Sequence, residues 1–300
     1  MQAVRQPHPA AAGALGATGR AARGHTVRDA LDGAITAITA AGCQTPRLDA
    51  EVLLASILGV SRERLLLDRE LRVEGGAVRA FQDSVRRRAV EREPVAYIVG
   101  RREFRRLELA VDRRALIPRP ETELLVEAAL ELPQGAHVLD VGTGSGAVAL
   151  ALKAERPDLE VTASEISDPA LELARANGLR LGLDVRWLRA DLLAGVPDGF
   201  EALVANLPYV AESERSALAP EILRHEPLGA LFAGADGLQA IRSLIEQLAS
   251  LPRVGFVALE VGAGQAGAVA GLVRGAGFRS ARRLRDLAGV ERVVLGEDRA

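Results

Sequence analysis

The chain has 300 residues, which is enough for one large domain or two modest ones. Hydrophobic residues make up 48% of it, ample for a core, and the net charge of −2 lacks the electrostatic signature of a protein that coats DNA. Cys43 is the single cysteine, which excludes an internal disulfide and is typical of a reducing compartment, so we expect a cytoplasmic location. The four histidines lack Cys or His partners at ligand spacing, so no metal site is predicted. No apolar run of about 18 residues is present, so no membrane span is expected.

Residues 1–25 consist mainly of Ala, Gly, Pro and Arg and contain no acidic residue. They have no hydrophobic periodicity, so we predict a disordered extension. An acid-free start that bears arginine is compatible with a transit peptide. A disordered extension or an upstream start codon is the preferred interpretation.

The next segment has the pattern of a small all-helical domain. Thr26 followed by Asp29 resembles a helix N-cap. Apolar residues then recur at helical spacing in four segments, the first two of which end at the breakers Gly42 and Gly59. Residues 26–92 are therefore predicted to form this domain.

Residues 93–114 are predicted to form a β-hairpin that links the helical domain to the rest of the chain. Val95 to Val99 and Phe104 to Val111 are strand-like. The stretch 116–123 that follows contains two prolines, and Glu121 to Leu132 has the pattern of a helix. A stiff, charged loop of this kind is often functional, although a simple linker is the alternative.

From residue 137 onward the chain alternates between strand and helix, which predicts an α/β domain with a parallel sheet over residues 115–300. The expected strands are 137–141, 160–165, 185–188, 202–206, 255–261, 278–284 and 290–295. The expected helices lie near 146–155, 168–181, 235–250 and 264–276.

Residues 138–146 have the pattern of a buried strand that runs into a glycine-rich turn. Gly142, Gly144 and Gly146 allow the backbone to turn sharply and to approach a ligand without a Cβ atom in the way. The helix that follows presents free N–H groups and a positive dipole end. Such a loop can hold a dinucleotide phosphate or the amino-acid part of S-adenosylmethionine (SAM), and many doubly wound folds carry one.

Three acids lie at the ends of the first three expected strands. Asp140 can organise the loop amides or, through water, face the ammonium group of SAM. Glu165 lies about twenty residues beyond the loop, where an acid can accept hydrogen bonds from both ribose hydroxyls. Asp191 is expected to face the adenine amino group, with Leu192 against the ring, although an Asp that merely forms a turn is the alternative.

The sequence Asn206-Leu207-Pro208-Tyr209 is expected at the carboxyl end of a strand, where ligands bind in open α/β sheets. An amide nitrogen is a poor nucleophile, so an enzyme that methylates one must position it and accept its hydrogens. The side-chain oxygen of Asn206 and the backbone carbonyl of Leu207 are candidates for the two acceptors, and Tyr209 for packing on a flat substrate. The alternative is a simple turn after a strand.

Together the glycine-rich loop and this motif resemble SAM-dependent methyltransferases of the Asn-Pro-Pro-Tyr type, from which the chain departs at Leu207. If position 207 contributes only its carbonyl, its side chain matters little. Leu207 precedes Pro208, so its backbone still favours extended conformations.

From about residue 26 onward the chain resembles the protein-(glutamine-N5) methyltransferases that act on peptide chain release factors. The Ile117-to-Glu123 stretch, with the helical segment before it, is the most specific part of the resemblance. The stretches that carry the resemblance are 47–54, 93–104, 116–123, the glycine-rich loop, the Asn206 motif, 226–237 and 259–262.

The resemblance implies a seven-stranded Rossmann-like domain that binds SAM, preceded by a helical substrate-recognition domain and a hairpin. It implies methyl transfer from SAM to the glutamine of the Gly-Gly-Gln motif of class I release factors, and we expect a monomer without direct nucleic-acid contacts. We assign cofactor binding to Asp140, Gly142, Thr143, Gly144, Ser145, Gly146, Glu165, Asp191, Leu192 and Asn206. Substrate binding is assigned to Asn206, Leu207, Pro208 and Tyr209, and catalysis to Asn206, Pro208 and Tyr209.

Three other functions remain as alternatives. One is methylation of a ribosomal-protein glutamine, and another is methylation of an amino group in a nucleic acid. The near-neutral charge and the absence of an obvious base-recognition domain argue against the second. The third is a non-catalytic SAM-binding partner protein, against which the retention of Asn206 and Tyr209 argues.

Overall fold

The structure is a computed structural model that describes residues 25–248 and 251–299. The chain divides into two compact units, Met1–Val99 and Gly100–Ala300. The extension expected to be disordered lies outside the described residues except for His25, which begins a two-residue strand.

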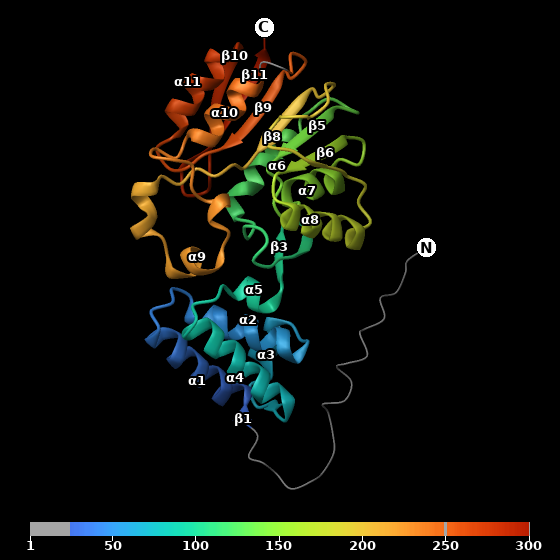
Figure 1. The fold of residues 1–300 in the computed structure, drawn as a ribbon. Helices are drawn as coiled ribbons and strands as arrows, with labels where there is room; N and C mark the ends of the chain where they lie inside the picture. The colour runs from blue at the N-terminus through green and yellow to red at the C-terminus, as the bar shows by residue number, and fades with distance from the viewer. Residues whose placement is uncertain (1–24, 249–250, 300) are drawn as a thin grey trace. The chain divides into compact units, whose positions relative to one another are not determined.

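The first unit is a cluster of helices, as the apolar spacing predicts (Figure 1). A capping box between Thr26 and Asp29 begins the first helix, and Gly59 ends the second in a left-handed conformation. Two very short strands, β1 and β2, pair antiparallel and were not expected from the sequence. The elements are β1 His25–Thr26, α1 Val27–Ala40, α2 Pro46–Leu58, α3 Arg62–Leu67, β2 Arg72–Val73, α4 Gly76–Ala89 and α5 Val95–Val99.

The prediction of a strand at Val95 to Val99 is wrong, because these residues form helix α5. The carbonyl of Pro94 accepts hydrogen bonds from the N–H groups of Tyr97 and Ile98, which closes a helical turn directly after the proline. Helical burial of Tyr97 overrides the β-propensity of the valines here. The hairpin lies further along the chain, in the second unit, where β3 (Arg101–Phe104) pairs with β4 (Leu107–Ala110).

A seven-stranded sheet forms the second unit, in the order β10-β11-β9-β8-β5-β6-β7. Neighbouring strands from β5 to β9 are parallel, whereas β11 runs antiparallel to both β9 and β10. The seven-stranded α/β fold predicted from the alternating pattern is thereby confirmed. The strands are β5 His137–Val141, β6 Glu160–Glu165, β7 Arg186–Arg189, β8 Ala202–Ala205, β9 Phe256–Glu260, β10 Phe278–Arg285 and β11 Glu291–Arg299.

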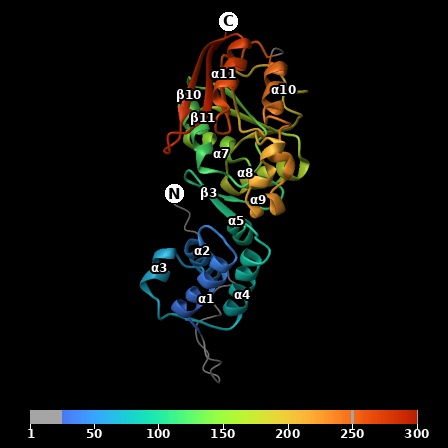
Figure 2. The ribbon, with the colours of Figure 1, turned by 90° about the vertical axis from the view of Figure 1, so that its left-hand side faces the viewer.

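Helices cover both faces of this sheet (Figures 1 and 2). Leu139 and Leu203 share a buried cluster with residues of α10 and α11, so these helices lie on one face. Asp140 points to the opposite face, where it accepts a hydrogen bond from an amide of α7. The α-helices of this unit are α6 Glu123–Ala129, α7 Ala147–Glu155, α8 Asp168–Leu181, α9 Pro220–His225, α10 Gln239–Leu248 and α11 Ala266–Gly275. The 3₁₀ helices are η1 Pro120–Thr122, η2 Glu212–Ala217 and η3 Leu228–Ala230.

Two regions of this unit differ from the pattern expected. The helix predicted for Glu121 to Leu132 is shorter: it is preceded by η1, which starts at a proline, and it ends at Ala129. The short helices η2, α9 and η3 between β8 and α10 were not predicted. The sequence between β8 and α10 has no apolar periodicity from which these helices could be predicted.

The sheet order determines where a ligand can bind. Strands β6 and β7 are added on one side of β5, and the next strand, β8, is added on its other side, parallel to β5. The order in which strands are added therefore reverses between β5 and β8. In such sheets the crevice outside the carboxyl ends of the strands at the reversal is the ligand site. Here that position brings together the loop after β5 and residues 206–209 after β8.

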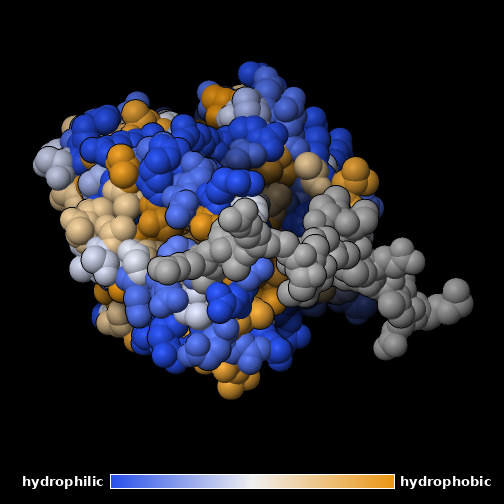
Figure 3. All heavy atoms as spheres, turned by 90° about the horizontal axis from the view of Figure 1, so that it is seen from below, coloured by the Kyte–Doolittle hydropathy of each residue, from blue (hydrophilic) through white to orange (hydrophobic). Residues whose placement is uncertain are grey.

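The molecular surface in Figure 3 is a mosaic in which hydrophilic residues separate small apolar patches. Exposed large apolar side chains of the first unit include Leu48, Leu66, Leu67 and Val90. Within the described residues, no helix has the length and apolar character needed to cross a membrane.

Candidate active site

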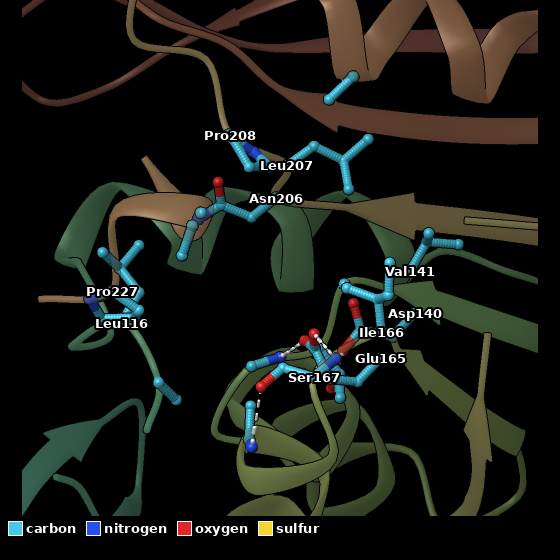
Figure 4. A pocket seen from close by; sticks show the side chains of 18 of the residues that line it. Leu116, Asp140, Val141, Glu165, Ile166, Ser167, Asn206, Leu207, Pro208 and Pro227 are labelled. Atoms are coloured by element: carbon cyan, nitrogen blue, oxygen red, sulfur yellow. Dashed lines mark hydrogen bonds between the residues drawn. The ribbon is translucent and has the colours of Figure 1, made fainter. Parts of the chain in front are cut away.

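A cavity of about 680 Å³ opens at the carboxyl ends of β5, β6 and β8. This volume is in the range typical of small-molecule sites. In Figure 4, Asp140 and Glu165 lie on one side of it, and Asn206 to Pro208 lie on another. Of the residues expected in the site, eleven line this cavity: Asp140, Gly142, Thr143, Gly144, Ser145, Glu165, Asp191, Leu192, Asn206, Leu207 and Pro208. Gly146 and Tyr209 do not line it.

The glycine-rich loop is held by the neighbouring strand. The N–H groups of Gly142 and Thr143 both donate to the carbonyl of Ser164 on β6, at 2.9 and 3.0 Å. Gly142 has φ +71°, a left-handed conformation that L side chains rarely adopt. The loop therefore has a fixed shape in which backbone faces the cavity.

Gly146 has a packing role. It precedes α7, and a Cβ atom there would lie 3.0 Å from Leu150 and 3.2 Å from Trp187. The third glycine of the loop thus allows α7 to pack closely on its neighbours.

Asp140 organises the loop from beneath. Its Oδ2 atom accepts hydrogen bonds from the Thr143 hydroxyl at 2.6 Å and from the Ala149 amide at 3.1 Å. The side chain is only 1% exposed. Burial raises the pKa of Asp140 to about 7, although both hydrogen bonds favour the ionised form. Asp140 therefore ties the Thr143 side chain of the loop to the first turn of α7.

Glu165 joins the end of β6 to the loops on either side. Its Oε2 atom accepts from the Gly144 amide at 2.9 Å, and its Oε1 atom accepts from the Ser167 amide at 2.9 Å. An ionised carboxylate has about four acceptor positions, so two remain for a ligand. A dihydroxyl group such as a ribose edge is the kind of ligand these positions suit.

Asp191 and Leu192 lie in a tight turn at the edge of the cavity. The carbonyl of Asp191 accepts from the Ala194 amide at 3.0 Å, and Leu192 has φ +54°. The side chain of Gln247 on α10 accepts from the Leu193 amide at 2.8 Å and fixes this turn from the other side. A leucine held in a left-handed conformation is uncommon and is often found at functional sites.

Asn206 follows β8 directly and reaches the cavity from the opposite side. Its Nδ2 atom donates a hydrogen bond to the hydroxyl of Thr122 at 3.0 Å. The side-chain oxygen Oδ1 then remains available as an acceptor. Thr122 belongs to the stretch 116–123, so this proline-containing stretch is part of the site.

Tyr209 is turned away from the cavity. Its hydroxyl donates to Oε1 of Glu260 at 3.4 Å, and burial together with the nearby Glu260 carboxylate raises the pKa of Tyr209 above its usual range. In this conformation its ring does not form part of a wall against which a substrate can stack.

Leu207 corrects an expectation. Its side chain is 4% exposed and belongs to the core cluster shared with α10 and α11. The statement that this side chain matters little is therefore wrong. In Figure 4 the side chains of Asn206 and Leu207 point in different directions. Asn206 hydrogen-bonds Thr122, whereas Leu207 packs in the core.

Two buried carboxylates of the site were not singled out from the sequence. Glu226 accepts from Arg119 at 2.5 Å and from the Ile117 amide at 3.3 Å, which anchors the 116–119 wall of the cavity. Glu260 lies behind Asn206 and Tyr209. Both residues belong to stretches that carry the family resemblance, 226–237 and 259–262, and an acid within such an apolar stretch is the signal that sequence reasoning could have used.

The fold and this site define a class of protein: a methyltransferase that uses SAM. The glycine-rich loop, the acid at the end of β6 and a crevice of suitable size fit that cofactor. The family profile described as the methyltransferase small domain matches residues 120–232, and the profile described as the PrmC N-terminal domain matches residues 29–100.

Two curated relatives extend the match to most of the chain. The release factor glutamine methyltransferase of Deinococcus radiodurans is 42% identical over 272 residues, which cover 89% of this chain and 97% of that protein. The protein of the same name from Rhodospirillum rubrum is 40% identical, over 90% of this chain and 84% of that protein. The chain belongs to the release factor glutamine methyltransferase family, and it is an enzyme that takes its methyl group from SAM.

Solved structures add the fold. The catalytic domain of hMettl16, in complex with the MAT2A 3′UTR hairpin 1, aligns with a TM-score of 0.53 over 77% of this chain and 84% of that chain. Its sequence identity of 13% supports a common fold and nothing more specific.

Proposed function

We propose that this enzyme methylates the side-chain amide nitrogen (N5) of the glutamine in the Gly-Gly-Gln motif of class I peptide chain release factors. The names of the relatives support a release factor as the substrate. The observation that carries the proposal is the orientation of Asn206. Its Nδ2 atom donates to Thr122, beside a cavity lined by the glycine-rich loop. Release factors act on ribosomes, so we place the reaction in the cytoplasm.

The chemistry required of the protein is positioning. Bound SAM supplies an electrophilic methyl group. The lone pair of an amide nitrogen is delocalised into its carbonyl, so the nitrogen must be held in line and shielded from water. In our proposal Oδ1 of Asn206 and the backbone carbonyl of Leu207 accept hydrogen bonds from the two N–H groups of the substrate amide. Pro208 restricts the backbone that carries these two acceptors.

The cofactor would be held by the residues around the first loop. Gly142 to Ser145 would approach the amino-acid part, with Asp140 fixing their conformation. Glu165 would accept from the ribose through its two remaining acceptor positions. Asp191 and Leu192 would contact the adenine.

We also propose that the helical unit recognises the release factor away from the glutamine. Residues 25–99 of this unit contain no cluster with an evident catalytic role. Because α5 belongs to this unit, a truncation should remove residues 1–99. Calorimetry should show that the truncated enzyme still binds S-adenosylhomocysteine, while its turnover on intact release factor falls. Equal turnover by both enzymes would show that the helical unit is dispensable.

The experiment that tests the main proposal is mass spectrometry of candidate substrates after incubation with enzyme and SAM. A release factor should gain one methyl group on the Gly-Gly-Gln glutamine, whereas a ribosomal protein and DNA should not. Methylation of only the ribosomal protein or only DNA would replace the proposed substrate. Absence of methylation on all three, with normal SAM binding, would favour a non-catalytic role.

A further inference from the structure

A chain of hydrogen bonds lies behind Asn206. The Nδ2 atom of Asn206 donates to the hydroxyl of Thr122. The Thr122 hydroxyl keeps its own proton for a second partner, and the carboxyl group of Glu260, which accepts from Tyr209 at 3.4 Å, is the acceptor that interacts with it. Three separate segments, η1, the turn after β8 and the end of β9, thus meet at one carboxylate.

Glu260 occupies an unfavourable place for a charge. It is the last residue of β9, in the sheet interior opposite Val293 of β11, and is 1% exposed. Its Oε2 atom has no hydrogen-bond partner among the described residues. A buried carboxylate with an unsatisfied oxygen lowers stability, so its position beside the amide acceptor calls for a functional explanation.

We propose that Glu260 is a positioning residue which, through Thr122, holds the Asn206 amide with its oxygen toward the substrate. This inference rests on the proposed function, because it assigns Oδ1 of Asn206 as an acceptor for the substrate amide. Tyr209 acts at the same carboxylate and fixes the turn that carries Asn206.

The direction of the hydrogen bonds gives the reason. An ionised carboxylate can only accept, so the single proton of the Thr122 hydroxyl points toward Glu260. The Thr122 oxygen can then only accept from its other side, which requires the Nδ2 group of Asn206 there. The amide is thereby turned so that Oδ1 faces away from Thr122 and toward the cavity.

Protonation of Glu260 would remove this constraint. A protonated carboxyl can donate to Thr122, whose hydroxyl would then be free to donate to Asn206. The Asn206 oxygen would become the preferred partner of Thr122, and Nδ2 would face the substrate. A donor at that place cannot accept from the substrate amide, so methyl transfer should require ionised Glu260.

The surroundings of Glu260 place its protonation in a pH range where the enzyme can be studied. The pKa of Glu260 is raised to about 7, chiefly by burial and also by the neighbouring carboxylate of Glu121, while Thr122, Tyr209 and Arg292 oppose the shift. Arg292 is held 3.0 Å from Asp286, which limits its effect on Glu260. Arg119, whose positive charge lowers the pKa of Tyr209, is paired with Glu226.

The first test separates the effect of the Thr122 hydroxyl from the effect of the side chain's volume. Thr122→Val keeps the shape and removes the hydrogen bonds, whereas Thr122→Ser keeps the hydroxyl. Thr162→Val is the control, since Thr162 is similarly buried on β6 and does not line the cavity. We expect kcat on release factor to fall on the order of 10- to 100-fold in Thr122→Val, with S-adenosylhomocysteine affinity unchanged and most activity restored in Thr122→Ser. Equal activity of Thr122→Val and wild type, or no restoration by serine, would overturn the proposal.

The second test does not depend on the substrate. In ¹⁵N-labelled enzyme, the side-chain amide signal of Asn206 can be assigned by its loss in Asn206→Ala. It should shift with a midpoint near pH 7 in wild type and stay constant from pH 6 to 8 in Glu260→Gln. A signal that titrates identically in both proteins would refute the role of Glu260. If the signal behaves as expected but the release factor is not methylated, the proposed function fails and the positioning network stands.

Discussion

Leu207 and Gly142 contact each other across the two motifs of the active site: a Cβ atom at Gly142 would lie 3.0 Å from Cδ2 of Leu207. The contact connects the loop assigned to the cofactor with the turn assigned to the substrate amide. The leucine side chain therefore contributes to the shape of the glycine-rich loop as well as to the core.

Gly142→Ala should disturb both motifs. The residue has φ +71°, so an alanine there is strained by about 1–2 kcal/mol, and its methyl group would also press on Leu207. We expect the free energy of unfolding to fall by at least this amount and SAM binding, measured by calorimetry, to weaken. Gly135→Ala is the matched control, with φ +73° and no atom within 4 Å of the added Cβ. Equal SAM affinity in the two variants would contradict the role of the contact.

Leu207→Ala should destabilise the enzyme because it leaves a cavity in the core. The expected loss is about 2–5 kcal/mol in the free energy of unfolding, read from denaturant titrations. The same packing is lost in Leu207→Pro, although that variant keeps the backbone carbonyl and should retain turnover per folded molecule. Leu179→Ala, at a side chain that is 87% exposed, should change stability by less than about 0.5 kcal/mol. A stable Leu207→Pro enzyme without turnover would show that the Leu207 side chain or its N–H has a catalytic role.

Glu165→Ala should weaken SAM binding by roughly 1.5–3 kcal/mol, through loss of charge-assisted hydrogen bonds to the ribose. The amides of Gly144 and Ser167 also lose their acceptor, so part of the effect comes from a looser loop. Thermal melting should show that the fold survives. Glu160→Ala, at the exposed start of the same strand, is the control. Unchanged SAM affinity in a normally folded Glu165→Ala variant would reject the assignment.

The sequence predicted the sheet well because its signals are local. The β5 strand is largely apolar, β6 alternates Val161 and Ala163 with polar residues, and both strands were placed at the residues the structure assigns. Alternation with helices then implied parallel pairing, and the parallel sheet implied that loops 142–146 and 206–209 meet.

The same reasoning failed where non-local contacts decide. Val95 to Val99 has strand propensity, yet Pro94 begins a helical turn there. The partners of Asn206 and Tyr209 lie 84 and 51 residues away in sequence, so no spacing rule connects them. Leu207 was regarded as a source of a carbonyl because its burial depends on α10 and α11, which local pattern does not report.

The stability of the enzyme should fall as the pH rises toward neutrality. Glu260 has an ordinary pKa near 4.5 and a pKa of about 7 when folded, so between these values the folded state binds more protons than the unfolded state. The stabilisation is full below about pH 4.5 and lost above about 7, and this pKa difference corresponds to roughly 3 kcal/mol. Asp140, raised from 3.8 to about 7, acts in the same direction.

The Glu260→Gln variant isolates the contribution of Glu260 to the pH dependence of stability, because glutamine stays neutral. Its melting temperature should exceed that of wild type at pH 8, and the difference should narrow at pH 5.5. The pH dependence of the melting temperature that remains in Glu260→Gln would then reflect the titration of Asp140. A constant difference between the two proteins from pH 5.5 to 8 would mean that Glu260 does not titrate in this range.

Asn206→Ala should remove most of the activity while leaving the cofactor site intact. If Oδ1 accepts from the substrate amide, the interaction matters most in the transition state, so the loss should fall on kcat more than on KM. Deletion of one oxyanion-hole donor, a comparable positioned hydrogen bond, raises a barrier by roughly 2–4 kcal/mol, and we expect a similar increase here. Mass spectrometry of the methylated Gly-Gly-Gln peptide gives the rate, and calorimetry with S-adenosylhomocysteine verifies the cofactor site. Activity within a few-fold of wild type would falsify the assignment of Asn206 as the acceptor, and a parallel loss of cofactor binding would assign Asn206 to the cofactor.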